Sequence, residues 1–209
     1  QPITMLTGQA VGTIAALAVK EGVQPRDVSV LKVQRLLLES GDRLALCVYK
    51  DVPSDHPFWA AVQLATVRGW MEPKSLPTFA AQRVDNYNDM LQASKKGRTK
   101  GIFGVDEPLS WRVANGMISD ILDDLGSQRK VVLHSGMSDE PIPRGKFILA
   151  LSEALYPSEA PKPITTDKEK IAWAYRKLSP FLKDPCGDPT GAITRGEALE
   201  IAMRALTGW

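Results

Sequence analysis

The sequence predicts a mainly α-helical protein, in which a short two-helix N-terminal unit precedes a larger domain of helical repeats. Apolar residues recur at helical spacing in most of the segments long enough to judge. Glycine and proline separate these segments, and one plan of turn, cap and apolar-striped helix recurs along the second part of the chain. With 44% hydrophobic and 24% charged residues, the composition of the 209-residue chain is that of a globular protein.

The first two predicted helices cover residues 5–20 and about 29–39, and they form the N-terminal unit, residues 1–42. A glycine follows each of them, as is usual at helix C-termini. Both helices are short and the first is poor in bulky side chains, so together they could bury little apolar surface. The chain also begins with Gln1 rather than Met. We therefore expect this unit to be the end of something larger, in a processed or truncated product.

The first helix is rich in small residues. Gly8, Gly12 and Ala16 recur every four residues and therefore share one face. Because each glycine costs roughly 1 kcal/mol relative to alanine in a helix interior, something should need the backbone to come close. Two explanations fit, a tightly packed helix pair or a ligand, and the spacing by itself favours packing.

The remaining helices belong to a second predicted domain, residues 50–209. The proline-punctuated stretch DVPSDHPFW at 51–59 leads into a helix at 57–70. A further helix at 79–94 has a weak pattern, and VVLH at 131–134 reads as extended chain. Asp167 is expected to be the N-cap of its helix. Clear helical patterns cover residues 110–125, 143–155, 167–182 and 194–206.

Three segments of this domain share one plan: a turn rich in Gly, Pro and Asp, an Ile or Leu, a Ser, Thr or Pro cap, then a helix with an apolar stripe. They are GIFGVDEPLSWRVANGMISDILDDL at 101–125, SDEPIPRGKFILALSEAL at 138–155 and DPTGAITRGEALEIAMRAL at 188–206. Two of them have an upstream partner helix, and the middle one lacks an evident one. We interpret them as three degenerate repeats, stacked as helical pairs around a shared core.

These repeats resemble the S-layer homology module. DVPSDHPFWAAVQLATVRGW at 51–70 is similar to the opening of that module, GIFGVDEPLS at 101–110 to its loop, and ITRGEALEIAMRAL at 193–206 to its close. In surface-anchoring members, the arginine of a Thr-Arg motif lies in grooves that bind anionic cell-wall polysaccharide. The resemblance therefore implies an SLH-like helical fold and, as a partner, cell-wall glycan.

Three residues are candidates for glycan binding on that resemblance: Arg144, Arg195 and Glu197. The family pattern is incomplete, because Trp111 stands at the third arginine position. Thr194 and Glu197 also have the Thr-x-x-Glu spacing of a capping box. Capping is therefore the alternative role for this pair, and the spacing favours it.

TGQAVGTIAALAVKEGVQPRDVSVLKVQRLLLESG at 7–41 resembles the C-terminal end of FAD-dependent oxidoreductases, in particular a bacterial xanthan-lyase-related group. In such proteins a Gly-Gln-Ala-Ala-Gly helix aims its N-terminus at the flavin, where unpaired amides and a partial positive charge suit a flavin carbonyl. Gly8, Gln9, Ala10 and Gly12 match that motif. The resemblance implies that they face the cofactor, but only in the intact protein.

A dinucleotide site needs a glycine-rich strand–turn–helix, and the sequence contains no GxGxxG motif. We therefore expect FAD in the intact parent protein and none in this fragment, with the upstream flavin domain of the same protein as its partner. No serine or cysteine nucleophile has an evident histidine partner, so no catalytic residue is assigned.

The composition disfavours several classes of protein function. A formal net charge of +2 argues against a nucleic-acid partner, and no apolar run reaches the ~20 residues of a membrane span. No metal site is expected from two histidines and two distant cysteines, Cys47 and Cys186, which could pair or stay free. The S-layer resemblance implies the cell envelope or secretion; no signal peptide is evident, and a cytoplasmic location stays open.

The sequence thus predicts the C-terminal fragment of an FAD-dependent oxidoreductase with an accessory helical domain, not catalytic by itself. The parent protein would be the enzyme. The alternatives are an SLH-like module that anchors a protein to cell-wall polysaccharide, or a helical protein-interaction domain.

Overall fold

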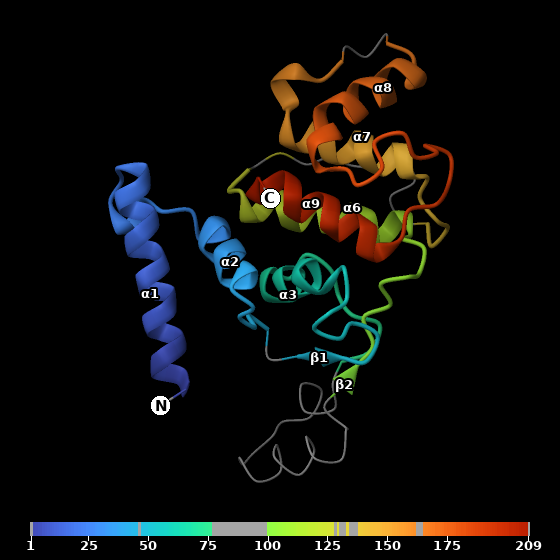
Figure 1. Cartoon of the computed structure of the whole chain (residues 1–209). Helices are drawn as coiled ribbons and strands as arrows, with labels where there is room; N and C mark the ends of the chain where they lie inside the picture. Colours follow the sequence, from blue (N-terminus) through green and yellow to red (C-terminus); the bar gives the residue numbers. More distant parts are fainter. Residues whose placement is uncertain are drawn as a thin grey trace.

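The computed structural model describes residues 2–45, 47–76, 100–127, 129, 133, 138–161 and 165–208. Two short strands, β1 (Val48–Tyr49) and β2 (Lys100–Gly101), pair in parallel. Three 3-10 turns lie at Pro25–Asp27, Pro157–Glu159 and Ser179–Phe181. The helices are α1 (Pro2–Glu21), α2 (Val30–Glu39), α3 (Trp59–Arg68), α6 (Trp111–Asp124), α7 (Arg144–Leu155), α8 (Asp167–Leu178) and α9 (Arg195–Thr207). The predicted mainly α-helical class is confirmed (Figure 1).

Most predicted helices are found within two or three residues of their expected bounds. The segment predicted as 167–182 ends earlier, at Leu178, because Pro180 cannot continue an α-helix and the chain turns at Ser179–Phe181. The helix predicted at 79–94 and most of the extended stretch at 131–134 lie outside the described residues.

The prediction that Asp167 is the N-cap of α8 is wrong by one residue. Thr166 has the extended cap conformation, and its hydroxyl accepts the amide N–H of Glu169. The carboxylate of Glu169 in turn accepts the amide of Thr166 at 3.0 Å, which completes a capping box. Asp167 is the first helical residue, where its negative charge suits the helix N-terminus.

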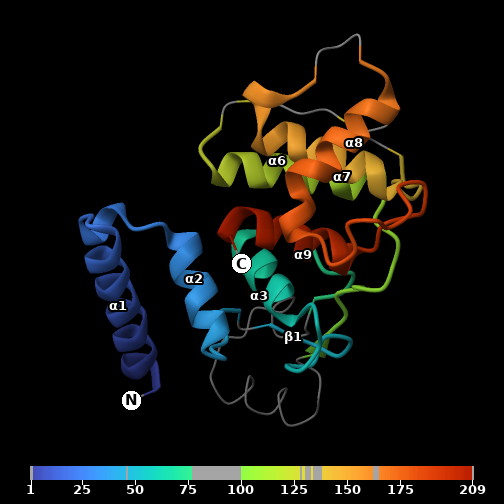
Figure 2. The same ribbon diagram turned by 45° about the horizontal axis from the view of Figure 1, so that its top comes forward.

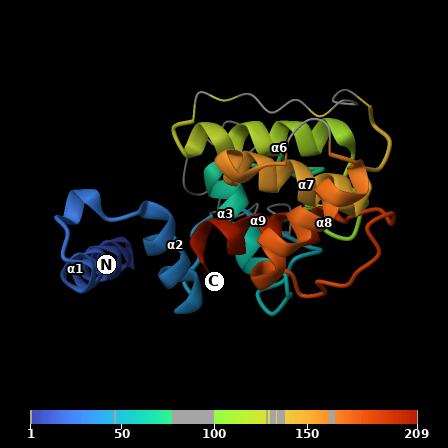
Figure 3. The same ribbon diagram turned by 90° about the horizontal axis from the view of Figure 1, so that it is seen from above.

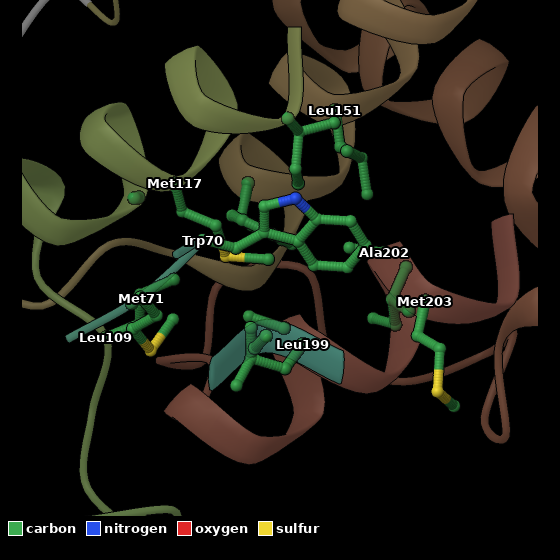
Figure 4. Packing of buried hydrophobic residues seen from close by; sticks show 14 of the residues in the cluster. Trp70, Met71, Leu109, Met117, Leu151, Leu199, Ala202 and Met203 are labelled. Carbon is green, nitrogen blue, oxygen red and sulfur yellow. The ribbon is translucent and has the colours of Figure 1, made fainter. Parts of the chain in front are cut away.

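The main core lies between α3, α6, α7 and α9, and Trp70 is among its largest fully buried side chains. Figure 4 shows the indole of Trp70 surrounded by Met117 of α6, Leu151 of α7 and Ala202 of α9. The indole N–H donates to Asp124 Oδ2 at 3.2 Å, so the polar atom of this buried ring has a partner.

Three chain segments meet within the main core through backbone hydrogen bonds. Leu109 N–H donates to the carbonyl of Ile193 at 2.8 Å, Ile142 N–H to that of Leu109 at 2.8 Å, and Ile193 N–H to that of Ile142 at 3.3 Å. The three bonds form a closed ring, and all three side chains are fully buried. Each residue stands two positions before a helix, so α6, α7 and α9 start from one common junction.

Helix α3 packs on α9, and α8 packs on α7. The second residue of α9 and the second residue of α7 are both glycines. Gly196 of α9 lies against Phe58, and Gly145 of α7 lies against Pro189. On α6 the corresponding residue is Arg112, which is exposed. A long charged side chain thus stands on α6 where the other two helices present bare backbone to a neighbour.

The N-terminal unit lies at one side of the molecule (Figures 1 and 3). Helix α1 packs against α2 and the Pro25–Asp27 turn, around a small separate cluster of Leu17, Ala18, Val28 and Val33. Helix α2 lies between α1 and the rest of the molecule (Figure 2). Within the described part of the chain, no helix has the length and apolarity to cross a membrane.

Candidate functional site

The small-residue face of α1 is open. A Cβ atom built on Gly8 or on Gly12 would meet no atom within 4 Å. Gly8, Gln9 and Gly12 are exposed, and Ala10 is half-buried. Neither of the two glycines is therefore required by packing within the described chain.

Large apolar side chains of α1 are exposed as well. Met5 is 74% exposed, Val11 59% and Val19 85%. Exposed apolar side chains and interior glycines do not stabilise a helix in water. This composition is therefore typical of a surface that another protein segment or domain covers.

Helix α1 begins at Pro2, three residues before the predicted start. The amides of Gly8 and Gly12 therefore lie inside the helix, where each bonds to a carbonyl four residues earlier, and the unpaired amides are those of the first turn. The physical role expected for the two glycines changes accordingly. They provide space beside the backbone rather than free hydrogen-bond donors.

Of the predicted glycan-binding residues, the structure brings Arg144 and Glu197 together. Arg144 is buried at the start of α7, and its Nε donates to Glu197 Oε1 at 2.6 Å. Its Nη1 donates to the Tyr175 hydroxyl at 2.9 Å and its Nη2 to the backbone carbonyl of Asp184 at 2.8 Å. Burial by itself would lower the pKa of Arg144, but the hydrogen bond and charge of Glu197 raise that pKa overall. All three guanidinium nitrogens of Arg144 therefore donate hydrogen bonds, which link the start of α7 to α8, to α9 and to the segment between them.

Arg195 lies apart from that pair, in a different environment. Its side chain stacks over the Phe103 ring, 5.5 Å from the centroid, and its Nη2 donates to the backbone carbonyl of Glu72. Its buried Nε has no hydrogen-bond partner among the described residues, and within the same part no carboxylate lies at ion-pair distance from it. Burial lowers the pKa of Arg195, although the charges of Glu107 and Asp51 oppose this.

The two arginines nevertheless share one kind of contact, a hydrogen bond to a backbone carbonyl. Each binds a backbone carbonyl beyond the C-terminal end of a neighbouring helix: Asp184 follows α8, and Glu72 follows α3. The arginine at the start of α7 therefore holds α8, and the one at the start of α9 holds α3. Sequence reasoning missed these partners, because a backbone carbonyl carries no sequence signal.

Thr194 is the N-cap of α9, and its hydroxyl accepts the amide of Glu197 at 3.2 Å. The prediction that the Glu197 side chain completes a capping box is wrong. The carboxylate of Glu197 is paired with Arg144 instead of returning to the Thr194 amide, because a charged donor is a stronger partner than a neutral amide.

The Asp of the DVP motif holds the glycine-rich loop. Asp51 accepts the amides of Phe103 at 2.9 Å and Gly104 at 2.6 Å. Burial by itself would raise the pKa of Asp51, but these amide hydrogen bonds hold it below the ordinary 3.8. Because Phe103 also stacks on Arg195, Asp51 positions the ring beneath that guanidinium.

An open, mostly apolar groove of about 390 Å³ lies beside α8. Tyr175, the partner of Arg144, lines it together with the exposed Cys186. Cys186 and Cys47 are both free thiols, so the bridge left open by the sequence is not formed. The groove is lined by Lys168, Ile171, Ala172, Tyr175, Pro185, Cys186, Gly187 and Pro189.

Comparison with known families gives a match at the N-terminal unit. Residues 1–37 match the family described as FAD dependent oxidoreductase. The matched range takes in α1, the Pro25–Asp27 turn and α2 as far as Leu37. No curated protein and no solved structure matches the chain. The N-terminal unit is thus similar to a portion of FAD-dependent oxidoreductases.

Proposed function

We propose that this chain is the C-terminal part of an FAD-dependent oxidoreductase, with a helical accessory domain that has no catalytic role of its own. The observation that carries the proposal is the coincidence of two features in α1. The family match covers the helix, and its small-residue face is open, with no atom near Gly8 or Gly12. The missing neighbour of that face would be the flavin-binding domain of the same protein.

The open face suits a flat ring. Gly8 and Gly12 lie on consecutive turns and on one face of α1, with Gln9 beside them, and without Cβ atoms on the two glycines a planar group can approach the helix backbone. These residues would line the flavin in the intact protein. FAD, when bound there, supplies the electron acceptor for the oxidation of the substrate. Most of the cofactor's binding residues would lie outside this sequence, as would the residues that select the substrate.

A visible absorption spectrum of the protein expressed from the complete natural reading frame tests this function. Bound flavin is the expected result, and a colourless protein would overturn the proposal. Gly12→Leu should lower the flavin content per protein, because the side chain would occupy the space next to the backbone. Gly116→Leu is the matched control: Gly116 is also helical, exposed and without a neighbour within 4 Å, but it lies in α6. The control should retain its flavin.

A second candidate function for the helical domain is binding of anionic cell-wall polysaccharide, as in S-layer homology modules. The ring formed by Leu109, Ile142 and Ile193 supports a three-repeat arrangement of this kind. The unpaired Nε of Arg195 favours that arginine as the anion-binding residue, whereas Arg144 is already neutralised by Glu197. This function would place the protein in the cell envelope or outside the cell.

Cosedimentation of the chain with purified peptidoglycan tests the second function. The chain should be enriched in the pellet over an albumin control. Arg195→Lys keeps the charge but loses the planar fork of donors, so it should reduce the pelleted fraction more than Arg144→Lys does. A pellet no richer than that of albumin would rule out anchoring and leave a protein-interaction domain as the alternative.

A further inference from the structure

Helix α2 contributes to two hydrophobic clusters at once. Val33 is buried with Leu17 and Ala18 of α1, whereas Leu38 is buried in the main core. At 3.6 residues per turn, a separation of five residues places Val33 and Leu38 on roughly opposite sides of the helix. One helix therefore serves as a wall of both hydrophobic clusters.

Polar contacts fix the side of α2 that faces the main core. Arg35 Nη1 donates to the backbone carbonyls of Thr207 at 3.2 Å and Gly208 at 3.1 Å. A cation is favourable at this point, because unpaired carbonyls give the C-terminal end of α9 a partial negative charge. Gln34 Oε1 accepts from Arg68 Nε at 2.8 Å, and that arginine is itself held by an ion pair to α6.

The chain that leaves α2 is also bound. The amides of Leu44 and Ala45 both donate to Oε1 of the buried Gln63 in α3, at 3.1 and 2.9 Å. Ala45 and Tyr49 are each only 3% exposed. The described part of the connection between the two predicted domains is thus packed onto the helical domain, unlike a solvated, flexible linker.

The family match ends at residue 37, inside α2. Helix α2 therefore belongs to the oxidoreductase portion by sequence and to the helical domain by packing. We propose that α2 docks the helical domain directly onto the flavin-binding domain of the same polypeptide and holds the two in one fixed orientation. The identity of this partner rests on the proposed function.

The orientation has a consequence for the intact protein. In Figure 1 the N-terminal end of α1 and the β1–β2 pair lie toward the same end of the molecule. A fixed α2 keeps that end of the helical domain on the side of the flavoprotein where α1 begins. A tethered domain would sample many positions instead.

Distances between two spin labels, measured by pulsed electron paramagnetic resonance, test the docking. One label is placed on α1 through Lys20→Cys, at an exposed position off the face that Gly8 and Gly12 share, and the other on the exposed native Cys186, with Cys47 replaced by alanine. The 209-residue chain and the protein from the complete reading frame are both measured, the latter with its other cysteines replaced. Each should give one narrow distance distribution. A broad distribution in either would overturn the proposal.

Variants of α2 show whether its contacts cause the fixed orientation. Leu38→Ala combined with Arg35→Ala should broaden the distribution, and so, to a smaller extent, should Arg35→Ala alone, which leaves the core intact. Val30→Ala is the control on the same helix, since Val30 is 59% exposed, and it should change nothing. A distribution that stays narrow in both test variants would contradict a docking role for this side of α2.

Flavin absorbance of the same samples separates the two proposals. A protein with bound flavin and a broad distribution would overturn the docking alone. A colourless protein with a narrow distribution would overturn the proposed function and, with it, the flavoprotein as the partner of α2.

Discussion

The ring of Phe58 lies so close to the backbone of Gly196 that a Cβ atom on Gly196 would stand 2.3 Å from Phe58 Cδ2. Phe58 is the residue before α3 and Gly196 the second residue of α9, so this contact sets how closely the two helices approach. A similar contact lies at the start of α7, where a Cβ atom on Gly145 would stand 2.9 Å from the Cβ of Pro189, in the segment between α8 and α9, and 3.3 Å from Ile171 Cγ2 of α8. Glycine is needed at both positions because ring atoms occupy the space of a side chain.

Replacing Gly196 by alanine should therefore destabilise the chain. We expect a loss of about 1–3 kcal/mol in the free energy of unfolding, as is typical when an extra methyl group is forced into a packed core. Urea denaturation followed by tryptophan fluorescence measures it. Gly116→Ala is the control and should be neutral or stabilising by up to about 1 kcal/mol, because nothing lies near Gly116 and alanine favours the helix. Equal effects of the two changes would contradict the contact.

Replacing Glu197 by glutamine should leave the buried guanidinium of Arg144 without its counter-charge. The Arg144 side chain is 8% exposed and that of Glu197 31%. We expect a loss of about 1–3 kcal/mol, because glutamine can still accept the hydrogen bond but only through a neutral oxygen, and the guanidinium loses its counter-charge. Asp139→Asn, which removes the exposed pair with Arg112, should cost less than about 1 kcal/mol. Thermal unfolding followed by circular dichroism compares the two, and a smaller effect at Glu197 would contradict the assignment.

The stability of the chain should fall in acid, in part through Asp51. The pKa of Asp51 is lowered in the folded state, so its stabilising contribution is complete above its ordinary pKa of 3.8 and is lost as the pH falls through the lower folded value. Asp51→Asn should therefore be less stable than the natural chain at about pH 5, with a difference that shrinks toward about pH 2. Urea midpoints across this range measure it. A difference independent of pH would show that the charge of Asp51 is not involved.

The central junction should be sensitive to any loss of volume. Ile142 is fully buried beside Leu109 and Ile193, so Ile142→Ala should cost about 2–5 kcal/mol through the lost transfer free energy and the cavity left behind. Ile102→Ala, at a residue 44% exposed, is the comparison and should cost far less. Chemical denaturation of both variants is the measurement, and similar midpoints would argue against a common core at this junction.

Much of the helical architecture could be predicted from periodicity and punctuation. The apolar stripe of residues 110–125 and the glycine after it correspond to α6, which ends at Asp124. Local competition between neighbouring polar residues was harder to predict. Thr166 rather than Asp167 caps α8, because the threonine alone has a glutamate three residues further on to complete the reciprocal pair.

The surroundings of the candidate site residues could not be predicted, because they depend on contacts between distant segments. Arg144 and Glu197 are 53 positions apart and meet only because α7 and α9 start from the same junction. The carbonyl of Glu72 lies 123 positions from Arg195. Glycan binding at Arg144, Arg195 and Glu197 stays a prediction, as does flavin contact at Gly8, Gln9, Ala10 and Gly12.

By itself the sequence predicted the helical class, most helix bounds and the resemblance of the N-terminal unit to FAD-dependent oxidoreductases, which the family match supports. These properties depend on local spacing and on short motifs. The tertiary structure decided what lies beside each residue: that the glycine face of α1 is open, that Arg144 is neutralised while Arg195 is not, and that α2 is shared between two clusters. Burial and charge pairing arise from segments far apart in the chain, and no local pattern encodes which segments meet.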